Sequence, residues 1–267
     1  TTTKQVTKEI RTMTENRINT KLLSQSLVIK SIWALVLPSS TKDWYRVFES
    51  MPRSIYNFSI RYLNNTLPNR SNMARWGTAT SMMCNFCPNQ QTLGHVVGAC
   101  PAALKDGRYT WRHNSVLISF ARALAAIKDL QVYADLDGAE FAPPSIISGD
   151  DLRPDLIAIR ENSVFVMELT VGFEPNLHKN AERKGEKYKD LLKKVQGKVS
   201  FLNLSIGALG TIANDAWNYK VWMEDIGLSE QESQRLIRKL ISITIRSTFY
   251  IFCRRDQPWT EPKLLHW

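Results

Sequence analysis

The chain has 267 residues, of which 43% are hydrophobic, and it carries a formal net charge of +10. This hydrophobic content is sufficient for a packed core and excludes a mainly disordered chain. No apolar run reaches the roughly 18 residues that a membrane-spanning helix needs, since the nearest, SLVIKSIWALVLP, is short and contains Lys30. Because no signal peptide is visible and the first residue is Thr1, we expect a piece of a longer protein.

Positive charge is concentrated in residues 1–83, which hold twelve Lys or Arg residues against four Asp or Glu residues. Their apolar spacing fits buried helices, with a break at Pro38 and a second helix from about Asp43. A further helix within MPRSIYNFSIRYLNNTLP places Arg53 and Arg61 among aromatic residues. We predict a basic helical segment that binds nucleic acid. The alternative is that the aromatic residues form core and the arginines a solvated surface.

Residues 84–104 contain three of the four cysteines, in the motif Cys84-x2-Cys87-x7-His95-x4-Cys100. A close cysteine pair followed by a histidine and a third cysteine is typical of a zinc knuckle. All four ligand positions are filled by protein, so the motif predicts a structural zinc ion with no open position for chemistry. Reduced cysteines at this spacing also favour a reducing compartment.

Residues 105–267 alternate between helical and extended patterns, which predicts an α/β fold with a small mixed sheet flanked by helices. The isolated Cys253 lies in the apolar run TFYIFC, and we expect it to be a buried small hydrophobic residue. YADLD at 133–137 is similar to the Tyr-x-Asp-Asp of reverse transcriptases, but Leu136 separates its acids, which favours a loop. The expected elements are a helix over 115–127, a loop over 133–150, strands near 153–160 and 164–171, a helix over 176–196, a strand over 199–212, and helices over 214–225 and 229–248.

Two acids lie on the adjacent strands near 153–160 and 164–171. If Glu161-Asn162 forms a two-residue hairpin turn, Asp155 lies directly opposite Glu168, with Cβ atoms about 5 Å apart. A three-residue turn would place the two acids on opposite faces of the sheet. In the first register the carboxylates are close enough to share one Mg²⁺ ion.

The helix that follows places a lysine on its apolar face. A buried lysine either extends its ammonium to solvent or meets an anion. Lys184 is therefore predicted to serve the two acids, with Lys187 at the border of the same face; the alternative is that all the lysines form a solvated face. The apolar face consists of Leu177, Ala181, Lys184, Tyr188, Leu191 and Val195.

Across about residues 70–200, the chain resembles the C-terminal region of non-LTR retrotransposon proteins with a restriction-enzyme-like endonuclease. The resemblance rests on the ordered series ARW, CNFC, QTLGHVVGAC, RYTWRHNSVL, YADLDG, RPDLIAI, VMELTVGFE and RKGEKY. It implies a PD-(D/E)xK-type site formed by Asp155, Glu168, Lys184 and Lys187. Thr170 stands where the lysine of the simple nuclease pattern would be, so the resemblance implies that this function moved to the helix.

The resemblance implies a nuclear, Mg²⁺-dependent endonuclease that nicks target DNA to prime reverse transcription of the element's RNA. A polymerase domain would be covalently linked beyond this chain, and Arg53, Arg61 and Arg153 are the expected nucleic-acid contacts. One alternative is a catalytically inactive zinc-knuckle module that binds nucleic acid or acts as a scaffold. A second is a knuckle protein that binds single-stranded RNA.

Overall fold

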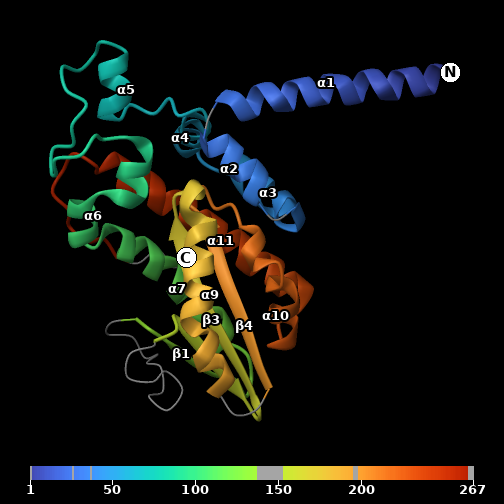
Figure 1. Ribbon diagram of the computed structural model, residues 1–267. Coiled ribbons are helices and arrows are strands. Elements are labelled where there is room, and N and C mark those ends of the chain that lie inside the picture. The colour runs from blue at the N-terminus through green and yellow to red at the C-terminus, as the bar shows by residue number, and fades with distance from the viewer. Residues whose placement is uncertain (1, 26, 37, 137–152, 195–197, 264–267) are drawn as a thin grey trace.

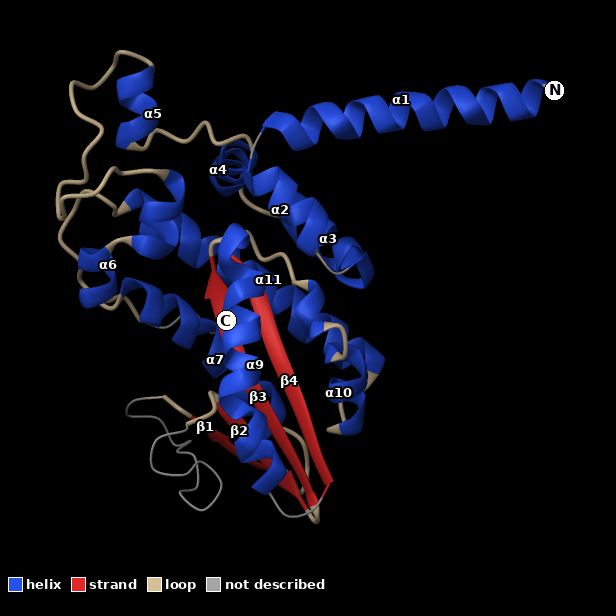
Figure 2. Ribbon diagram, viewed as in Figure 1, coloured by secondary structure: helices blue, strands red, loops and turns tan. Residues whose placement is uncertain are grey.

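The computed structural model describes residues 2–25, 27–36, 38–136, 153–194 and 198–263 (Figure 1). Within these ranges, a mixed four-stranded sheet is packed between helices, and a mainly helical region precedes it (Figure 2). The predicted α/β class is therefore confirmed. None of the helices in the described ranges is both long enough and apolar enough to cross a lipid bilayer.

The sheet has the strand order β1-β2-β3-β4. Its first three strands are antiparallel neighbours, and β4 runs parallel to β3 after a crossover through helix α9 (Leu177–Lys194). Strands β2 and β3 are joined by the predicted two-residue turn, since Arg160 pairs with Ser163. The turn is tight because Glu161 adopts a left-handed conformation, with φ 52°. The strands are β1 (Gln131–Ala134), β2 (Leu156–Arg160), β3 (Ser163–Gly172) and β4 (Lys198–Gly207).

Helices cover both faces of the sheet. On one face, Phe165 and Met167 of β3 join a core cluster with helices α7 (Arg108–Ala125) and α11 (Glu230–Cys253). On the other face, Val166 and its neighbours form a smaller cluster beneath α9. Successive side chains along β3 point to opposite faces of the sheet and therefore meet different helices. Glu168 shares the face of Val166 and points toward α9.

The N-terminal helices and the cysteine-rich segment pack on the sheet domain through a second core cluster. Tyr62 from α4, Val97 from the knuckle and Phe252 from α11 are all buried in this cluster. Residues from all three predicted segments, 1–83, 84–104 and 105–267, thus share one core. The remaining helices are α1 (Thr3–Gln25), α2 (Leu27–Leu35), α3 (Thr41–Glu49), α4 (Arg53–Leu63), α5 (Arg70–Arg75), α6 (Pro101–Lys105) and α10 (Tyr219–Asp225), with short turns η1 (Pro38–Ser40), η2 (His95–Ala99), η3 (Glu174–Asn176) and η4 (Asn214–Ala216).

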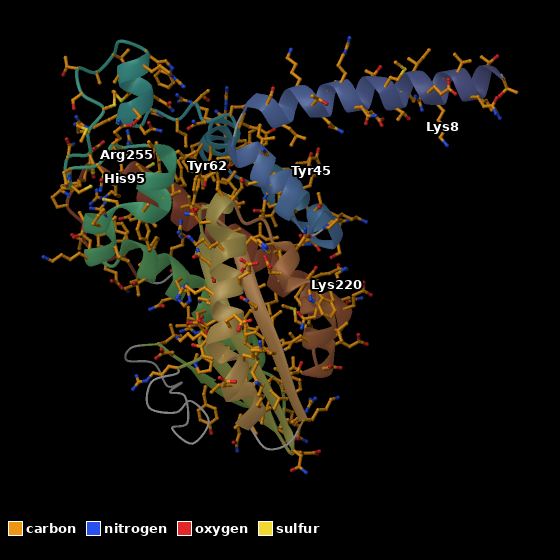
Figure 3. The ribbon with its side chains drawn as sticks, viewed as in Figure 1. Lys8, Tyr45, Tyr62, His95, Lys220 and Arg255 are labelled. Atoms are coloured by element: carbon orange, nitrogen blue, oxygen red, sulfur yellow. The ribbon has the colours of Figure 1, made fainter. Side chains whose placement is uncertain are left out.

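Helix α1 differs from the other helices because it projects away from the body of the protein (Figure 1). Most of its described side chains, including Lys8, are exposed to solvent (Figure 3). Met13 is 72% exposed, and Ile10 is 59% exposed. The helix is therefore not held by burial of an apolar face.

Several element predictions were wrong in detail. Tyr133 belongs to strand β1, where it pairs with Ile157, rather than to a loop. Residues 137–152 of the predicted loop lie outside the described residues. The strand predicted over 199–212 ends at Gly207, because the chain turns back through Gly210, at φ +78°. Cys253 is exposed, since the last turn of α11 buries its two preceding residues and directs Cys253 to solvent.

Candidate functional site

The four predicted zinc ligands converge in the structure. The ligand atoms of Cys84, Cys87, His95 and Cys100 all lie within 4.8 Å of one another. Cys87 Sγ is 3.4 Å from His95 Nε2 and 3.9 Å from Cys100 Sγ. Three thiols and one imidazole in this arrangement could bind a structural zinc ion.

Local backbone contacts hold the two halves of this cluster. The Cys84 N–H donates to the Asn89 carbonyl over 2.8 Å, which closes the turn that carries the first cysteine pair. The other two ligands stand at the start and just beyond the end of turn η2. The Tyr109 hydroxyl fastens them, since it accepts from the Cys100 N–H and donates to the His95 carbonyl, each over 3.1 Å. Helix α7, which carries Tyr109, thereby supports the cluster.

Burial shifts the pKa values of the two buried candidate ligands, His95 and Cys100, in opposite directions. It lowers the pKa of His95, which keeps the imidazole neutral and able to donate a lone pair to a metal. It raises the pKa of Cys100 to about 11, so zinc would have to displace the thiol proton on binding. Zinc affinity should therefore be proton-linked.

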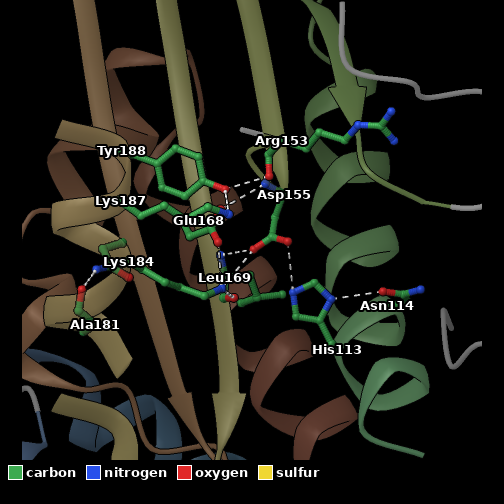
Figure 4. Close-up of polar contacts among 11 residues, drawn as sticks. His113, Asn114, Arg153, Asp155, Glu168, Leu169, Ala181, Lys184, Lys187 and Tyr188 are labelled. Atoms are coloured by element: carbon green, nitrogen blue, oxygen red, sulfur yellow. Dashed lines mark hydrogen bonds and ion pairs between the residues drawn. The ribbon is translucent and has the colours of Figure 1, made fainter. Parts of the chain in front are cut away.

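The two predicted acids lie side by side, Asp155 just before the start of β2 and Glu168 in the middle of β3 (Figure 4). Leu156 pairs with Met167, and the same register continued by one residue places Asp155 opposite Glu168. The Asp155 N–H donates to Glu168 Oε2 over 3.2 Å, and the Leu169 N–H donates to Asp155 Oδ2 over 2.7 Å. Asp155 itself precedes the strand, which begins at Leu156 rather than near residue 153.

Lys184 of α9 lies between the two carboxylates (Figure 4). Its Nζ is 2.9 Å from Glu168 Oε1 and 3.4 Å from Asp155 Oδ2, and it also donates to the Leu169 carbonyl. The Lys184 side chain is only 16% exposed. Of the two outcomes expected for a lysine on this face, the structure shows the one in which the ammonium meets anions.

Lys187 is placed differently, although it is one helical turn further along α9. Its Nζ contacts the Tyr188 hydroxyl at 3.0 Å, and that hydroxyl donates to the Arg153 carbonyl over 2.7 Å. No ion pair joins Lys187 to either acid within the described residues. The structure therefore brings Lys184, but not Lys187, into direct contact with Asp155 and Glu168.

A histidine that sequence reasoning missed completes the cluster. His113 of α7 places its Nε2 3.4 Å from Asp155 Oδ1, on the side of the carboxylate opposite to Lys184 (Figure 4). Its Nδ1 lies 3.0 Å from Asn114 Oδ1. His113 falls within RYTWRHNSVL, one of the segments that carried the resemblance, but no spacing rule links it to an acid so far along the chain.

The pKa values of this cluster reflect burial and mutual charge. Burial alone raises the pKa of Asp155, but its contacts with His113, Lys184 and the Leu169 N–H outweigh burial and lower it to about 2. Burial and the charge of Asp155 raise the pKa of Glu168. The pKa of Asp155 is thus lowered and that of Glu168 is raised, as happens when two carboxylates that repel each other share a site.

The arginines predicted to bind nucleic acid lie outside this cluster. Arg53 and Arg153 are exposed. The Arg61 guanidinium donates to the Thr66 carbonyl over 2.9 and 3.1 Å, beyond the end of helix α4. In the part of the chain that the structure describes, no hydrogen bond or ion pair joins these three side chains to Asp155 or Glu168. Their role in binding stays a prediction.

The chain was also compared with known proteins. No protein-family model matches it, and no curated protein matches it either. The structure therefore shows two clusters on an α/β fold, one of which could bind zinc, and identifies no family.

Proposed function

We propose that this chain is a metal-dependent DNA endonuclease that nicks target DNA to prime reverse transcription of a non-LTR retrotransposon. One observation carries the nuclease assignment: Asp155 and Glu168 from adjacent strands meet on one face of the sheet, with the Lys184 ammonium against both. Carboxylates that hold a divalent cation, together with an ammonium, are what phosphodiester hydrolysis requires. The retrotransposon context comes only from the sequence resemblance.

The residues present fit a Mg²⁺ ion. Asp155 and Glu168 offer the hard oxygen ligands that Mg²⁺ prefers. Burial and the charge of Asp155 raise the pKa of Glu168, and a bound cation would offset both effects. When bound, such an ion supplies charge stabilisation and a more acidic water. Lys184 would offset the negative charge that develops on the phosphate. Lys187, which is exposed beside it, is the second candidate for this role.

The other predicted parts would position the nucleic acid. Under this proposal, the zinc cluster and the basic helices with Arg53 and Arg61 contact phosphates of target DNA or of the element's RNA. Arg153 is exposed two residues before Asp155, so under this proposal its side chain would meet the nucleic-acid strand that enters the site. The proposal also places the protein in the nucleus, with a polymerase domain linked to it.

A second function is favoured by a specific observation. The Lys184 ammonium forms ion pairs with both acids, an arrangement that would also suit a fold that has lost catalysis. The chain would then be a zinc-stabilised nucleic-acid-binding module derived from such an element. In this alternative, the two acids and Lys184 form a structural ion-pair cluster that needs no divalent cation. The nuclease, in contrast, requires a divalent cation for cleavage.

A plasmid-nicking assay tests the choice. Supercoiled plasmid is incubated with Mg²⁺ and either the wild-type chain or Asp155→Ala, after zinc content and duplex binding have been matched. The nuclease proposal expects open-circular product from the wild type and a loss of about 1000-fold in rate for the variant, since several kcal/mol of stabilisation are removed. Equal nicking by both would contradict the nuclease proposal, and no nicking by a folded wild type that binds DNA favours the inactive module.

A further inference from the structure

Asp155 is held by donors from three separate elements. The Leu169 N–H of β3 and the Lys184 ammonium of α9 both approach Oδ2, whereas His113 Nε2 of α7 approaches Oδ1 at 3.4 Å. The carboxylate is therefore contacted on both oxygens. His113 is the one partner among these three that approaches from the side away from Glu168 (Figure 4).

The His113 ring is itself well supported. Its Nδ1 lies 3.0 Å from Asn114 Oδ1, and this contact orients the ring with Nε2 toward Asp155. The preceding residues anchor the helix: Trp111 and Arg112 are each 1% exposed, and Arg112 donates to the Val171 carbonyl of β3. Helix α7 thus presents the imidazole from a fixed backbone position relative to the sheet.

His113 is not placed as a third ligand of a shared cation. Within the described residues, the group of three or more His, Cys, Asp or Glu ligand atoms that converges within 4.8 Å is the Cys/His cluster. The imidazole instead contacts the oxygen of Asp155 that is farther from Lys184.

We propose that His113 is a positioning residue: it donates from Nε2 to Asp155 Oδ1 and fixes the carboxylate so that Oδ2 faces the position of the cation. This inference rests on the proposed function, because it assigns Asp155 to a cation. Residues that hydrogen-bond to ligating carboxylates typically change metal affinity 10- to 100-fold when they are replaced. His113 should therefore act on cation binding through Asp155 without touching the cation.

Manganese binding provides a measurement that does not depend on cleavage. Mn²⁺ takes oxygen ligands as Mg²⁺ does, and its binding to the zinc-loaded chain is followed by electron paramagnetic resonance. We expect His113→Leu to weaken the Asp155-dependent Mn²⁺ site 10- to 100-fold. His113→Gln, whose amide can still donate, should recover most of the affinity. Thr110→Ala, an exposed position on the same helix, is the matched control and should bind as the wild type does.

The outcomes separate this inference from the nuclease proposal. If His113→Leu weakens Mn²⁺ binding and Gln restores it while no variant nicks plasmid, the positioning role stands and the nuclease proposal fails. If the wild type nicks and His113→Leu, with an unchanged melting temperature, binds Mn²⁺ and nicks equally well, the positioning role is overturned alone. A wild type without an Asp155-dependent Mn²⁺ site also overturns it, since there is then no cation for His113 to position.

Discussion

The Cys/His cluster and the carboxylate cluster are built in opposite ways. All four candidate zinc ligands come from residues 84–100, and one tight turn and one helical turn bring them together. The carboxylate cluster draws His113 from α7, Asp155 and Glu168 from the sheet, and Lys184 from α9. The first cluster depends on local chain geometry, and the second depends on how a sheet is covered by helices on both faces.

This contrast has energetic consequences. A zinc ion bound by the first cluster would contribute folding free energy directly, because it would bind the folded arrangement of its four ligands. The second cluster contains two acids and one ammonium, all largely buried, which stabilise the fold only as a set. Removal of zinc should therefore destabilise the Cys/His cluster, whereas removal of one charged side chain should destabilise the carboxylate cluster.

The largest expected effect is loss of zinc from the first region. Replacement of one of four ligands, Cys87→Ser, should remove roughly a quarter of the ~10–16 kcal/mol typical of structural zinc, or on the order of 100-fold in zinc affinity. The measurement is competition with a colorimetric zinc chelator, combined with amide hydrogen exchange over residues 84–104.

Exposed Cys253 provides the matched control, because Cys253→Ser changes a thiol outside the cluster. If the regions are as independent as their construction suggests, exchange over strands β2 and β3 stays slow in Cys87→Ser. Rapid exchange throughout the sheet would instead show that the shared core containing Val97 and Phe252 couples them.

An effect of similar size is expected when the second region loses the Lys184 ammonium. Lys184→Met keeps the length of the side chain but leaves Asp155 and Glu168 facing each other with their shared ammonium removed. We expect about 3 kcal/mol of destabilisation at neutral pH, because an uncompensated charge stays buried. Urea unfolding measures this change, and millimolar Mg²⁺ should recover part of it by binding the folded state.

Lys189→Met on the same helix is the comparison for that measurement. Lys189 pairs with Glu186 at 3.5 Å, and both side chains are largely exposed, so the change should be below about 1 kcal/mol. Equal effects of the two lysine variants would contradict the bridging role of Lys184.

The third prediction concerns how the free energy of unfolding depends on pH in acid, and it is centred on Asp155. Its pKa in the folded chain is lowered from 3.8 to about 2, so its ionised form stabilises the fold by roughly 2 kcal/mol above pH 4. That contribution is lost as pH falls from about 4 toward 2. Glu168 has the opposite sign, because its pKa is raised and its protonation removes a cost.

Asp155→Asn should therefore show a flatter fall in urea stability between pH 4 and pH 2 than the wild type does. Wild-type and variant profiles that are parallel across this window would mean that Asp155 is not held by its cationic neighbours. Glu161→Gln, in the exposed turn between β2 and β3, is a suitable control for loss of an acid.

The sequence by itself was sufficient for features that depend on neighbours along the chain. The zinc ligands follow from spacing, the β2–β3 register from a two-residue turn, and the burial of Tyr188 from the period of helix α9. Each of these is a local property, in which backbone geometry fixes which side chains share a turn or a face. The class of fold follows from the same periodicities read in order.

Only the tertiary structure decided what those faces meet. The approach of His113 to Asp155, the choice of Lys184 over Lys187, and the projection of α1 into solvent depend on how helices pack across the sheet. Packing joins residues that are distant in sequence through shape and burial, which no spacing rule records. Local periodicity therefore predicted the carboxylate pair, and packing determined which side chains surround it.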